Sequence, residues 1–196
     1  MPKLFIISGC NGAGKTTASY TILPEMLNCA EFVNADEIAK ELDPFAPEHV
    51  ALRASKLMLE RMRELIGKKT DFAIETTLAP KSLRNIILDA QEQGYSVTLV
   101  YFWLNVPQLA IERVKLRVAS GGHNVDEAVI IRRYYVGLKN LLKMYIPIVD
   151  YWITIDNSSA KFEIIAEGGK QVVTKIHNKT LYNLLINYER IGDSEP

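Results

Sequence analysis

The sequence predicts an α/β domain built on a parallel five-stranded sheet with helices on both faces. Two observations predict this fold class: short apolar runs alternate with segments of helical periodicity, and a glycine-rich turn joins the first run to the first helix. In such sheets the crossovers are right-handed and functional sites lie beyond the carboxyl ends of the strands. We therefore look for functional residues where the predicted strands end.

Five apolar or β-branched runs are typical of buried strands. They are Leu4–Ser8, Glu31–Asp36, Asp71–Thr77, Ser96–Leu104 and Tyr151–Ile155. Residues at helical spacing occupy most of the segments between them. The predicted helices are Lys15–Leu27, Pro47–Ile66 with Gly67 as its C-terminal cap, Pro80–Gln93, Val106–Val118, and one that Asp126 caps and that stops before Pro147.

The pattern changes after the fifth strand. Phe162–Ala166 and Gln171–Ile176 flank a glycine turn at Glu167–Lys170, which predicts a β-hairpin. Lys179–Arg190 follows as an amphipathic helix. We expect the apolar face of this helix to pack against the core, because core packing is the usual use of such a face.

Composition and net charge exclude some classes of protein. The 196 residues include 23 Lys and Arg and 23 Asp and Glu, so the net charge is zero and does not favour binding to a nucleic acid or to an anionic membrane. The two cysteines lack metal-ligand spacing, and no apolar run could span a bilayer, so we expect a cytoplasmic protein. We expect a single domain over 1–196, with a core over 3–158 and the hairpin and helix over 160–196.

The sharpest motif matches G-x-x-x-x-G-K-[ST], the P-loop that binds nucleoside triphosphates. Its residues are Gly9, Cys10, Asn11, Gly12, Ala13, Gly14, Lys15 and Thr16, with Thr17 directly after them. Glycines allow the backbone to form a nest of N–H donors around the β-phosphate, and the following helix adds its N-terminus. Lys15 is expected on the β- and γ-phosphates, and the Thr16 hydroxyl on Mg²⁺. The sequence therefore predicts a P-loop NTPase.

Two carboxylates at strand ends favour a kinase over a GTPase, whose N-K-x-D and D-x-x-G segments are absent from the sequence. Asp36 ends the second strand, where a kinase needs a base for the proton of the acceptor hydroxyl. Helix N-capping is the alternative for Asp36, and it is compatible with catalysis. Glu75 lies beside Thr76 and Thr77 in a polar cluster that suits a substrate hydroxyl or Mg²⁺-bound water. A structural salt bridge is the alternative for Glu75.

Arginines on both sides of a glycine pair predict a lid near 117–133. Arg113 and Arg117 share one helix face before Gly121 and Gly122, and Arg132 and Arg133 follow on the next predicted helix. This arrangement favours Arg117 and one of Arg132 or Arg133 as functional residues. A helix–loop–helix segment of this kind can close over a triphosphate and offset charge during phosphoryl transfer. For any single arginine, a solvated ion pair is the alternative.

Together these motifs resemble the zeta toxin family of P-loop kinases, in its compact single-domain branch. The resemblance rests on residues 9–17, 34–39, 72–79, 117–125, 131–134, 140–141 and 156–158. It implies an adenylate-kinase-like core. It also implies that ATP and Mg²⁺ are used to phosphorylate a hydroxyl of UDP-N-acetylglucosamine or a related UDP-sugar.

The resemblance also implies roles for individual residues. The implied set is Lys15 and Thr16 for ATP and Mg²⁺, Asp36 as base, Glu75 and Thr76 for the sugar, Arg117 and Arg133 as catalytic groups on the phosphates, and Asn157 beside the nucleotide base. An antitoxin protein is the partner that the family suggests. Two alternatives stay open at this point. One is a kinase for another sugar or nucleoside-type metabolite, and the other is a non-catalytic ATP-binding switch or interaction module.

Overall fold

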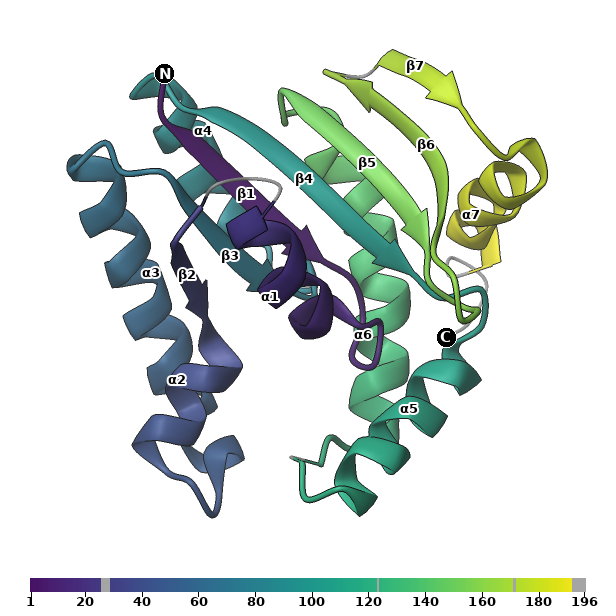
Figure 1. Cartoon of the computed structure of the whole chain (residues 1–196), viewed down its shortest axis with the longest axis horizontal. Coiled ribbons are helices and arrows are strands. Elements are labelled where there is room, and N and C mark those ends of the chain that lie inside the picture. The colour runs from purple at the N-terminus through teal and green to yellow at the C-terminus, as the bar shows by residue number, and fades with distance from the viewer. Residues whose placement is uncertain (26–28, 123, 171, 192–196) are drawn as a thin grey trace.

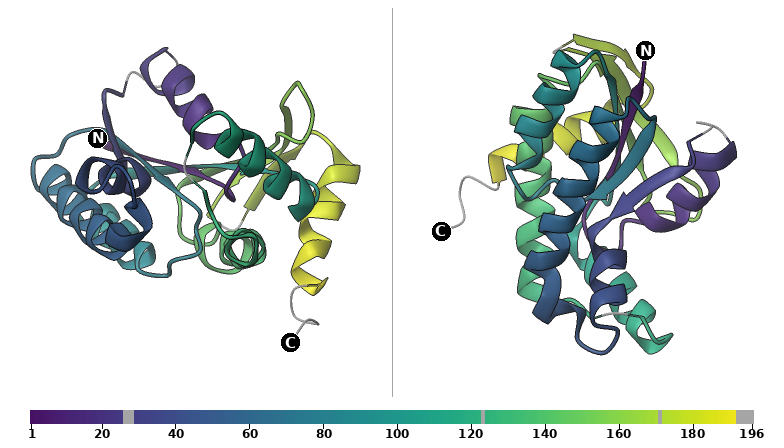
Figure 2. Two further views of the ribbon diagram at one scale, coloured as in Figure 1. Left: turned by 90° about the horizontal axis from the view of Figure 1, so that it is seen from below. Right: turned by 90° about the vertical axis from the view of Figure 1, so that its left-hand side faces the viewer.

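One seven-stranded sheet forms the middle layer of the structure, with helices on both of its faces (Figure 1, Figure 2). The computed structural model describes residues 1–25, 29–122, 124–170 and 172–191. The strand order is β2-β3-β1-β4-β5-β6-β7. The strands are β1 (Lys3–Ser8), β2 (Glu31–Asn34), β3 (Phe72–Thr76), β4 (Ser96–Trp103), β5 (Tyr151–Asp156), β6 (Glu163–Gly169) and β7 (Val172–Ile176).

Strands β1 to β5 are parallel, as the sequence predicts, and this part of the sheet positions the site. β1 lies between β3 and β4, and Ser8 at its end pairs with Thr76 and with Tyr101. Asn34 at the end of β2 pairs with Glu75 of β3. The carboxyl ends of β2, β3 and β1 therefore meet at one edge of the sheet, where the glycine-rich loop follows β1.

The helices form two layers with separate cores. Helices α1 and α5 lie on one face of the sheet, and α3, α4, α6 and α7 lie on the other (Figure 2). Successive residues of β1 face opposite cores, as expected of a strand. Ile6 lies in the core with residues of α3 and α4, and Ile7 lies in the core with residues of α5. The helices are α1 (Lys15–Glu25), α2 (Ala35–Leu42), η1 (Pro47–Val50, a 3₁₀ turn), α3 (Ala51–Gly67), α4 (Leu83–Glu92), α5 (Pro107–Ala119), α6 (Glu127–Asn140), η2 (Leu141–Tyr145, a π-helical turn) and α7 (Lys179–Ile191).

The predicted C-terminal hairpin and helix are present, and the hairpin extends the parallel sheet. β6 pairs antiparallel with β5, and β7 pairs antiparallel with β6. The prediction that Gly168 and Gly169 form the turn is wrong, because both lie in β6. A Cβ on Gly168 would lie 2.8 Å from the Trp152 ring, so glycine allows β6 to pack closely there. Gln171, the predicted start of the second strand, lies outside the described residues.

Several helix boundaries differ from the sequence predictions. The long helix expected over Pro47–Ile66 starts as η1 and continues as α3. Gly67 is its last residue and not its cap, because the left-handed φ of +55° falls at Lys69. The next helix starts later than predicted, at Leu83. The predicted end of the first helix, Leu27, lies outside the described residues.

Two other local predictions are confirmed. Asp126 caps α6, because its side chain accepts a hydrogen bond from the Ala128 N–H at 2.8 Å. The apolar face of α7 packs against the core through Leu181 and Leu185. Over the ranges that the structure describes, no helix combines the length and the apolar character that crossing a membrane requires.

Candidate active site

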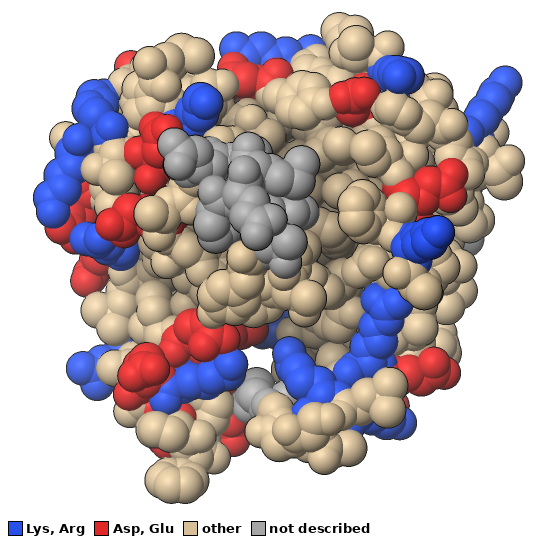
Figure 3. Space-filling view, in the orientation of Figure 1, with Lys and Arg blue, Asp and Glu red and all other residues tan. Residues whose placement is uncertain are grey.

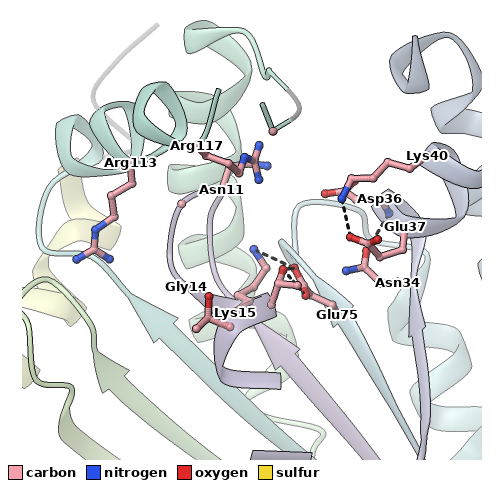
Figure 4. A pocket seen from close by; sticks show the side chains of 14 residues that line it. Asn11, Gly14, Lys15, Asn34, Asp36, Glu37, Lys40, Glu75, Arg113 and Arg117 are labelled. Atoms are coloured by element: carbon pink, nitrogen blue, oxygen red, sulfur yellow. Dashed lines mark hydrogen bonds and ion pairs between the residues drawn. The ribbon is translucent and has the colours of Figure 1, made fainter. Parts of the chain in front are cut away.

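A cavity of about 260 Å³ lies at the carboxyl edge of the parallel strands (Figure 3, Figure 4). In Figure 3 the lower part of this face is hollowed, with acidic and basic side chains to the left of the hollow and basic ones to its right. Figure 4 shows Arg113 and Arg117 extending from α5 on one side and Asp36, Glu37 and Lys40 from α2 on the other. The lining residues are Asn11, Gly12, Gly14, Lys15, Thr16, Thr17, Asn34, Asp36, Glu37, Lys40, Glu75, Arg113, Arg117 and Gly122.

The glycine-rich loop between β1 and α1 lies unusually close to two neighbouring strand ends. Gly9 and Gly14 have φ angles of +143° and +83°, which residues with a side chain rarely adopt. A Cβ on Gly9 would lie 2.2 Å from the Phe102 carbonyl oxygen, and one on Gly14 would lie 2.5 Å from Asn157 Nδ2. Glycine is therefore required at both positions. The resulting loop, together with the N-terminus of α1, favours a bound anion.

Two other side chains of the loop point into the core. Cys10 is 2% exposed and Ala13 is fully buried, both in the core that α5 covers. Burial raises the pKa of the Cys10 thiol to about 11, so the thiol is protonated at neutral pH. The Cys10 carbonyl oxygen accepts a hydrogen bond from Lys15 Nζ at 2.9 Å. Any role of Cys10 and Ala13 at the cavity is thus carried by their backbone groups.

Lys15, Thr16 and Glu75 form a largely buried polar cluster that lines the cavity. Figure 4 shows Lys15 and Glu75 side by side. The Thr16 hydroxyl lies 2.9 and 3.1 Å from the two carboxylate oxygens of Glu75, to which it donates. Lys15 Nζ lies 3.6 Å from Glu75 Oε1, and both side chains are less than a tenth exposed. Because β3 is the neighbour of β1, the end of β3 brings Glu75 next to the first turn of α1.

Thr16 and Glu75 match Mg²⁺ in their donor chemistry. Both offer oxygen, the ligand that Mg²⁺ prefers, and Mg²⁺ commonly takes one or two protein oxygens while water and phosphate complete its shell. Within the described ranges, no group of three or more His, Cys, Asp and Glu side chains is placed to hold a metal ion. A metal at Thr16 and Glu75 would therefore take its other ligands from water and phosphate. The structure thus brings Glu75 to the predicted metal ligand, Thr16, whereas the family resemblance implies Glu75 as a sugar contact.

Asp36 faces the cavity from the first turn of α2. The alternative that Asp36 caps this helix is wrong, because Asn34 is the N-cap and its Oδ1 accepts the Asp36 N–H at 2.8 Å. Asp36 also lines two neighbouring cavities, so it lies where three hollows meet. Its neighbours Glu37 and Lys40 form an ion pair of 2.7 Å at the rim. The Asp36 carboxylate is therefore available to a bound molecule.

The predicted arginines lie on both sides of the loop that joins α5 to α6. Arg117 lines the cavity from the last turn of α5, and Gly122 packs against it, since a Cβ there would lie 2.5 Å from Arg117 Cγ. Arg133 of α6 donates from Nη1 to Asn11 Oδ1 at 3.2 Å and so faces the glycine-rich loop. Arg113, predicted on the same helix face as Arg117, lines the cavity one helical turn before it and donates to the Ser158 carbonyl oxygen at 3.3 Å.

A second cavity, of about 430 Å³, adjoins the first along α1. Asn157 lines it and is tied to the loop, because its Nδ2 donates to the Ala13 carbonyl oxygen at 2.9 Å. Its apolar walls include Phe162, which is 65% exposed. The sequence pattern predicts Phe162 only as the start of a strand. Its position shortly after the fifth strand, near Asn157, is the signal that could have identified it as a residue of this cavity. The lining residues are Gly14, Thr17, Ala18, Phe102, Arg113, Ile155, Asn157 and Phe162.

A third cavity, of about 410 Å³, opens on the opposite side, beyond Asp36 and Glu75. Thr76 contributes to its lining, and its hydroxyl oxygen accepts the Leu78 N–H at 3.1 Å. Helical periodicity predicts core positions for Met58 and Met62, and both lie in the core while they also border this cavity. The larger apolar residues of its lining are Leu52, Met58, Leu59, Met62, Pro80 and Leu83.

Comparison with known proteins identifies related chains. A family model described as "Zeta toxin" matches residues 1–179. An uncharacterised protein of Haemophilus influenzae is 28% identical over 132 residues, which cover 67% of this chain and 92% of that protein.

Solved structures share the fold. The chain resembles the AvrRxo1-ORF1:AvrRxo1-ORF2 structure with sulphate ions at a TM-score of 0.75 and 16% identity, over 94% of this chain and 63% of that one. The PezAT chromosomal toxin–antitoxin system of Streptococcus pneumoniae matches at a TM-score of 0.64 and 16% identity, over 98% of this chain and 85% of that one. At these identities, the likeness to the two structures shows a common fold, which is that of P-loop kinases with a C-terminal antiparallel hairpin and helix.

Proposed function

The chain belongs to the zeta toxin family, and from this membership and its site we propose that it is an ATP-dependent small-molecule kinase. The reaction transfers the γ-phosphoryl group to a hydroxyl. The observation that carries the proposal is the meeting of cavities at Asp36 and Glu75. One of these cavities is bounded by a phosphate-binding loop and the other is large enough for a small molecule.

The donor nucleotide fits the first two cavities. The β- and γ-phosphates would lie against the loop and Lys15, and the base would enter the apolar cavity beside Asn157 and Phe162. An arginine over an aromatic ring is a common setting for a planar base, and Arg113 and Phe162 both line this cavity. Thr16 and Glu75 would hold Mg²⁺, whose charge, when it is bound, offsets that of the phosphate oxygens.

The acceptor hydroxyl would lie against Asp36. Asp36 takes the proton as the hydroxyl oxygen attacks the γ-phosphorus, and the bond between that phosphorus and the β–γ bridging oxygen breaks. Arg117 and Arg133 offset the negative charge that spreads over the transferred group. ADP leaves with the bridging oxygen. In this scheme the P-loop, α2, α5 and α6 each contribute one charged residue, and these are Lys15, Asp36, Arg117 and Arg133.

A UDP-sugar such as UDP-N-acetylglucosamine is the acceptor that we propose first, on the family resemblance. The apolar wall of the third cavity gives a specific reason to keep a second acceptor class, the nucleoside-type metabolites, since a base can pack on Leu52 and Leu59. PezAT is described as a toxin–antitoxin system. An antitoxin-like protein partner is accordingly part of the proposal and is testable by co-purification.

The test is transfer of label from [γ-³²P]ATP to UDP-N-acetylglucosamine, N-acetylglucosamine, uridine and a metabolite extract. We expect a labelled acceptor product that forms only with Mg²⁺ and in proportion to acceptor concentration. Label released as inorganic phosphate at the same rate with and without acceptors would contradict the kinase and favour the ATP-binding switch. Transfer to uridine but not to the UDP-sugar would replace the first acceptor class by the second.

A further inference from the structure

Three residues of α6 form one stripe that runs from the phosphate-binding loop to the turn after β3. Arg133, Gly137 and Asn140 are spaced i, i+4 and i+7, so they share one face of the helix. Arg133 donates to Asn11 of the loop at 3.2 Å. At the other end, Asn140 Nδ2 donates to the carbonyl oxygens of Leu78 and Ala79 at 2.7 and 3.2 Å. One helix face thus touches both sides of the site.

The middle of the stripe brings the two backbones together. A Cβ on Gly137 would lie 2.4 Å from the Thr77 carbonyl oxygen, far closer than any Cβ contact in proteins. Glycine at this position therefore lets the turn after β3 lie directly on α6. The turn carries Thr76 and Thr77, which both line the third cavity.

The turn itself has an unusual conformation that its neighbours maintain. Leu78 is fully buried and has a φ of +57°, which costs energy in a residue with a side chain. Thr76 holds it from one side by accepting the Leu78 N–H, and Asn140 holds it from the other. Tyr145 adds a bond from its hydroxyl to the Pro80 carbonyl oxygen at 2.8 Å. Burial raises the pKa of Tyr145 to about 12, so the hydroxyl keeps the proton that it donates.

We propose that Asn140 is a positioning residue of the acceptor site. Its side-chain amide, which is 6% exposed, fixes the turn that presents Thr76 and Thr77 and holds this turn at a set distance from Arg133. α6 is also anchored near Arg133, because the Tyr134 hydroxyl donates to the Leu104 carbonyl oxygen at 2.6 Å. The acceptor side of the site and a phosphate-facing arginine are therefore built on one fixed helix. The functional part of this inference rests on the proposed kinase activity.

The direct test is hydrogen–deuterium exchange of Asn140→Ala over residues 76–83. Loss of the two bonds leaves two carbonyl oxygens without their donor, so we expect exchange there to rise by about 10- to 100-fold. The matched control is Gln91→Ala, because Gln91 also donates its side-chain amide to a backbone carbonyl, that of Ile148, at 2.8 Å. Gln91→Ala should leave exchange over 76–83 at the wild-type rate and raise it near residue 148.

Kinetics separate positioning from a general loss of stability. In Asn140→Ala the acceptor KM should rise by about 10-fold, while the ATP KM stays within about twofold, because both bonds that the Asn140 side chain donates end on the turn, at Leu78 and Ala79. Equal rises in both KM values, or exchange that rises uniformly along the chain, would overturn the proposal. If Asn140→Ala does not fold, Tyr145→Phe removes a single hydroxyl and should raise exchange near residue 80 by about 3- to 10-fold. An unchanged rate in that variant would overturn the proposal as well.

The exchange measurement also distinguishes this inference from the proposed function. It needs no acceptor, so it decides whether Asn140 fixes the turn even when wild-type protein labels no acceptor. If wild-type protein labels no acceptor, the kinase proposal fails, and the exchange rates over residues 76–83 alone decide whether Asn140 fixes the turn.

Discussion

The proposed donor side and the proposed acceptor side of the site are built in different ways. The donor side is built around one continuous loop, residues 9–17, in which backbone groups at glycines with positive φ form much of the surface. The acceptor side combines side chains from α2, α3, β3 and the turn that α6 holds. A backbone site needs a short run of particular residues, whereas a side-chain site needs only that distant segments meet. A motif therefore identifies the first, and only the fold reveals the second.

Glu75 lies on the border between the two sides. The end of β3 places its carboxylate on Thr16 and Lys15 of the donor loop, yet the same residue lines the acceptor cavity. Asp36, which lines both of these cavities too, lies on α2 across from the loop. We therefore propose that Glu75 serves the donor phosphates and their metal, and that Asp36 serves the acceptor hydroxyl. The variants below test this division.

The largest effect is expected from Lys15→Ala, which removes the charged side chain of the donor loop. Without it, the β- and γ-phosphates lose their point charge, and we expect phosphoryl transfer to fall by about 10³-fold or more. The measurement is the rate of label transfer from ATP, with ATP binding measured in parallel by calorimetry. Lys68→Ala, which removes only a surface ion pair with Glu64, is the control. Transfer at more than a tenth of the wild-type rate would remove the loop from the mechanism.

Asp36→Asn tests the acceptor side. Asn34 and not Asp36 caps α2, so this change leaves the helix intact, and the ATP affinity should change by less than about threefold. Turnover should fall by about 10²- to 10⁴-fold, the contribution of a positioned general base. The control on the same element is Asp43→Asn, because Asp43 lies at the other end of α2 and accepts backbone N–H groups there. Near-normal turnover in Asp36→Asn would show that another group takes the proton.

The contrast between the two sides also explains what the sequence could predict. The five parallel strands follow from apolar runs, because a strand buried on both faces carries its signal locally. The glycine-rich loop is predicted from its own residues for the same reason, because the signal lies within one short segment. The turn after β3 has no such signal, since Leu78 adopts a positive φ only because Thr76, Asn140 and Tyr145 hold its surroundings. Its conformation depends on residues that lie more than 60 positions away in the chain.

Local sequence pattern is informative in different degrees at two places. Helical spacing predicts core positions for Met58 and Met62, and both are buried in the core, although the same helix face also borders the third cavity. Periodicity reports which face is apolar and cannot tell whether protein or a ligand covers it. Gly168 and Gly169 are predicted in a turn but lie in β6, where a Cβ on Gly168 would meet the Val172 carbonyl oxygen and the Trp152 ring, and one on Gly169 would meet the Asp150 carbonyl oxygen. At these glycines the packing of neighbouring strands decides a choice that local pattern leaves open.

Glu75→Gln sharpens the division between the two sides. The amide keeps a hydrogen-bond acceptor for Thr16 but loses the charge that faces Lys15 and would help hold Mg²⁺. We expect the Mg²⁺ concentration for half-maximal transfer to rise by about 10- to 100-fold, with a smaller change in the acceptor KM. Titration of Mg²⁺ at saturating ATP is the measurement, and Glu64→Gln on the surface of α3 is the control. A rise confined to the acceptor KM would return Glu75 to the acceptor side.

The smallest effect is expected at Cys10, inside the donor loop itself. If Cys10 acts only through its backbone groups, Cys10→Ala should change kcat/KM by less than about threefold, because a buried protonated thiol is not a nucleophile. Burial raises the pKa of Cys10 from 9.0 to about 11, so native protein should resist iodoacetamide at pH 8 and react once guanidinium unfolds it. The raised pKa of Cys10 also makes the free energy of unfolding depend on pH. The thiol loses its proton at lower pH in the unfolded chain than in the folded one, so the stabilisation from Cys10 is complete below pH 9.0 and disappears as the pH rises to about 11. Unfolding of wild type and Cys10→Ala, measured at pH 8 and pH 11, should therefore show a smaller pH dependence in the variant by about 2 kcal/mol. A large loss of transfer in Cys10→Ala, with an unchanged fold, would mean that the side chains of the loop matter as those of the acceptor side do.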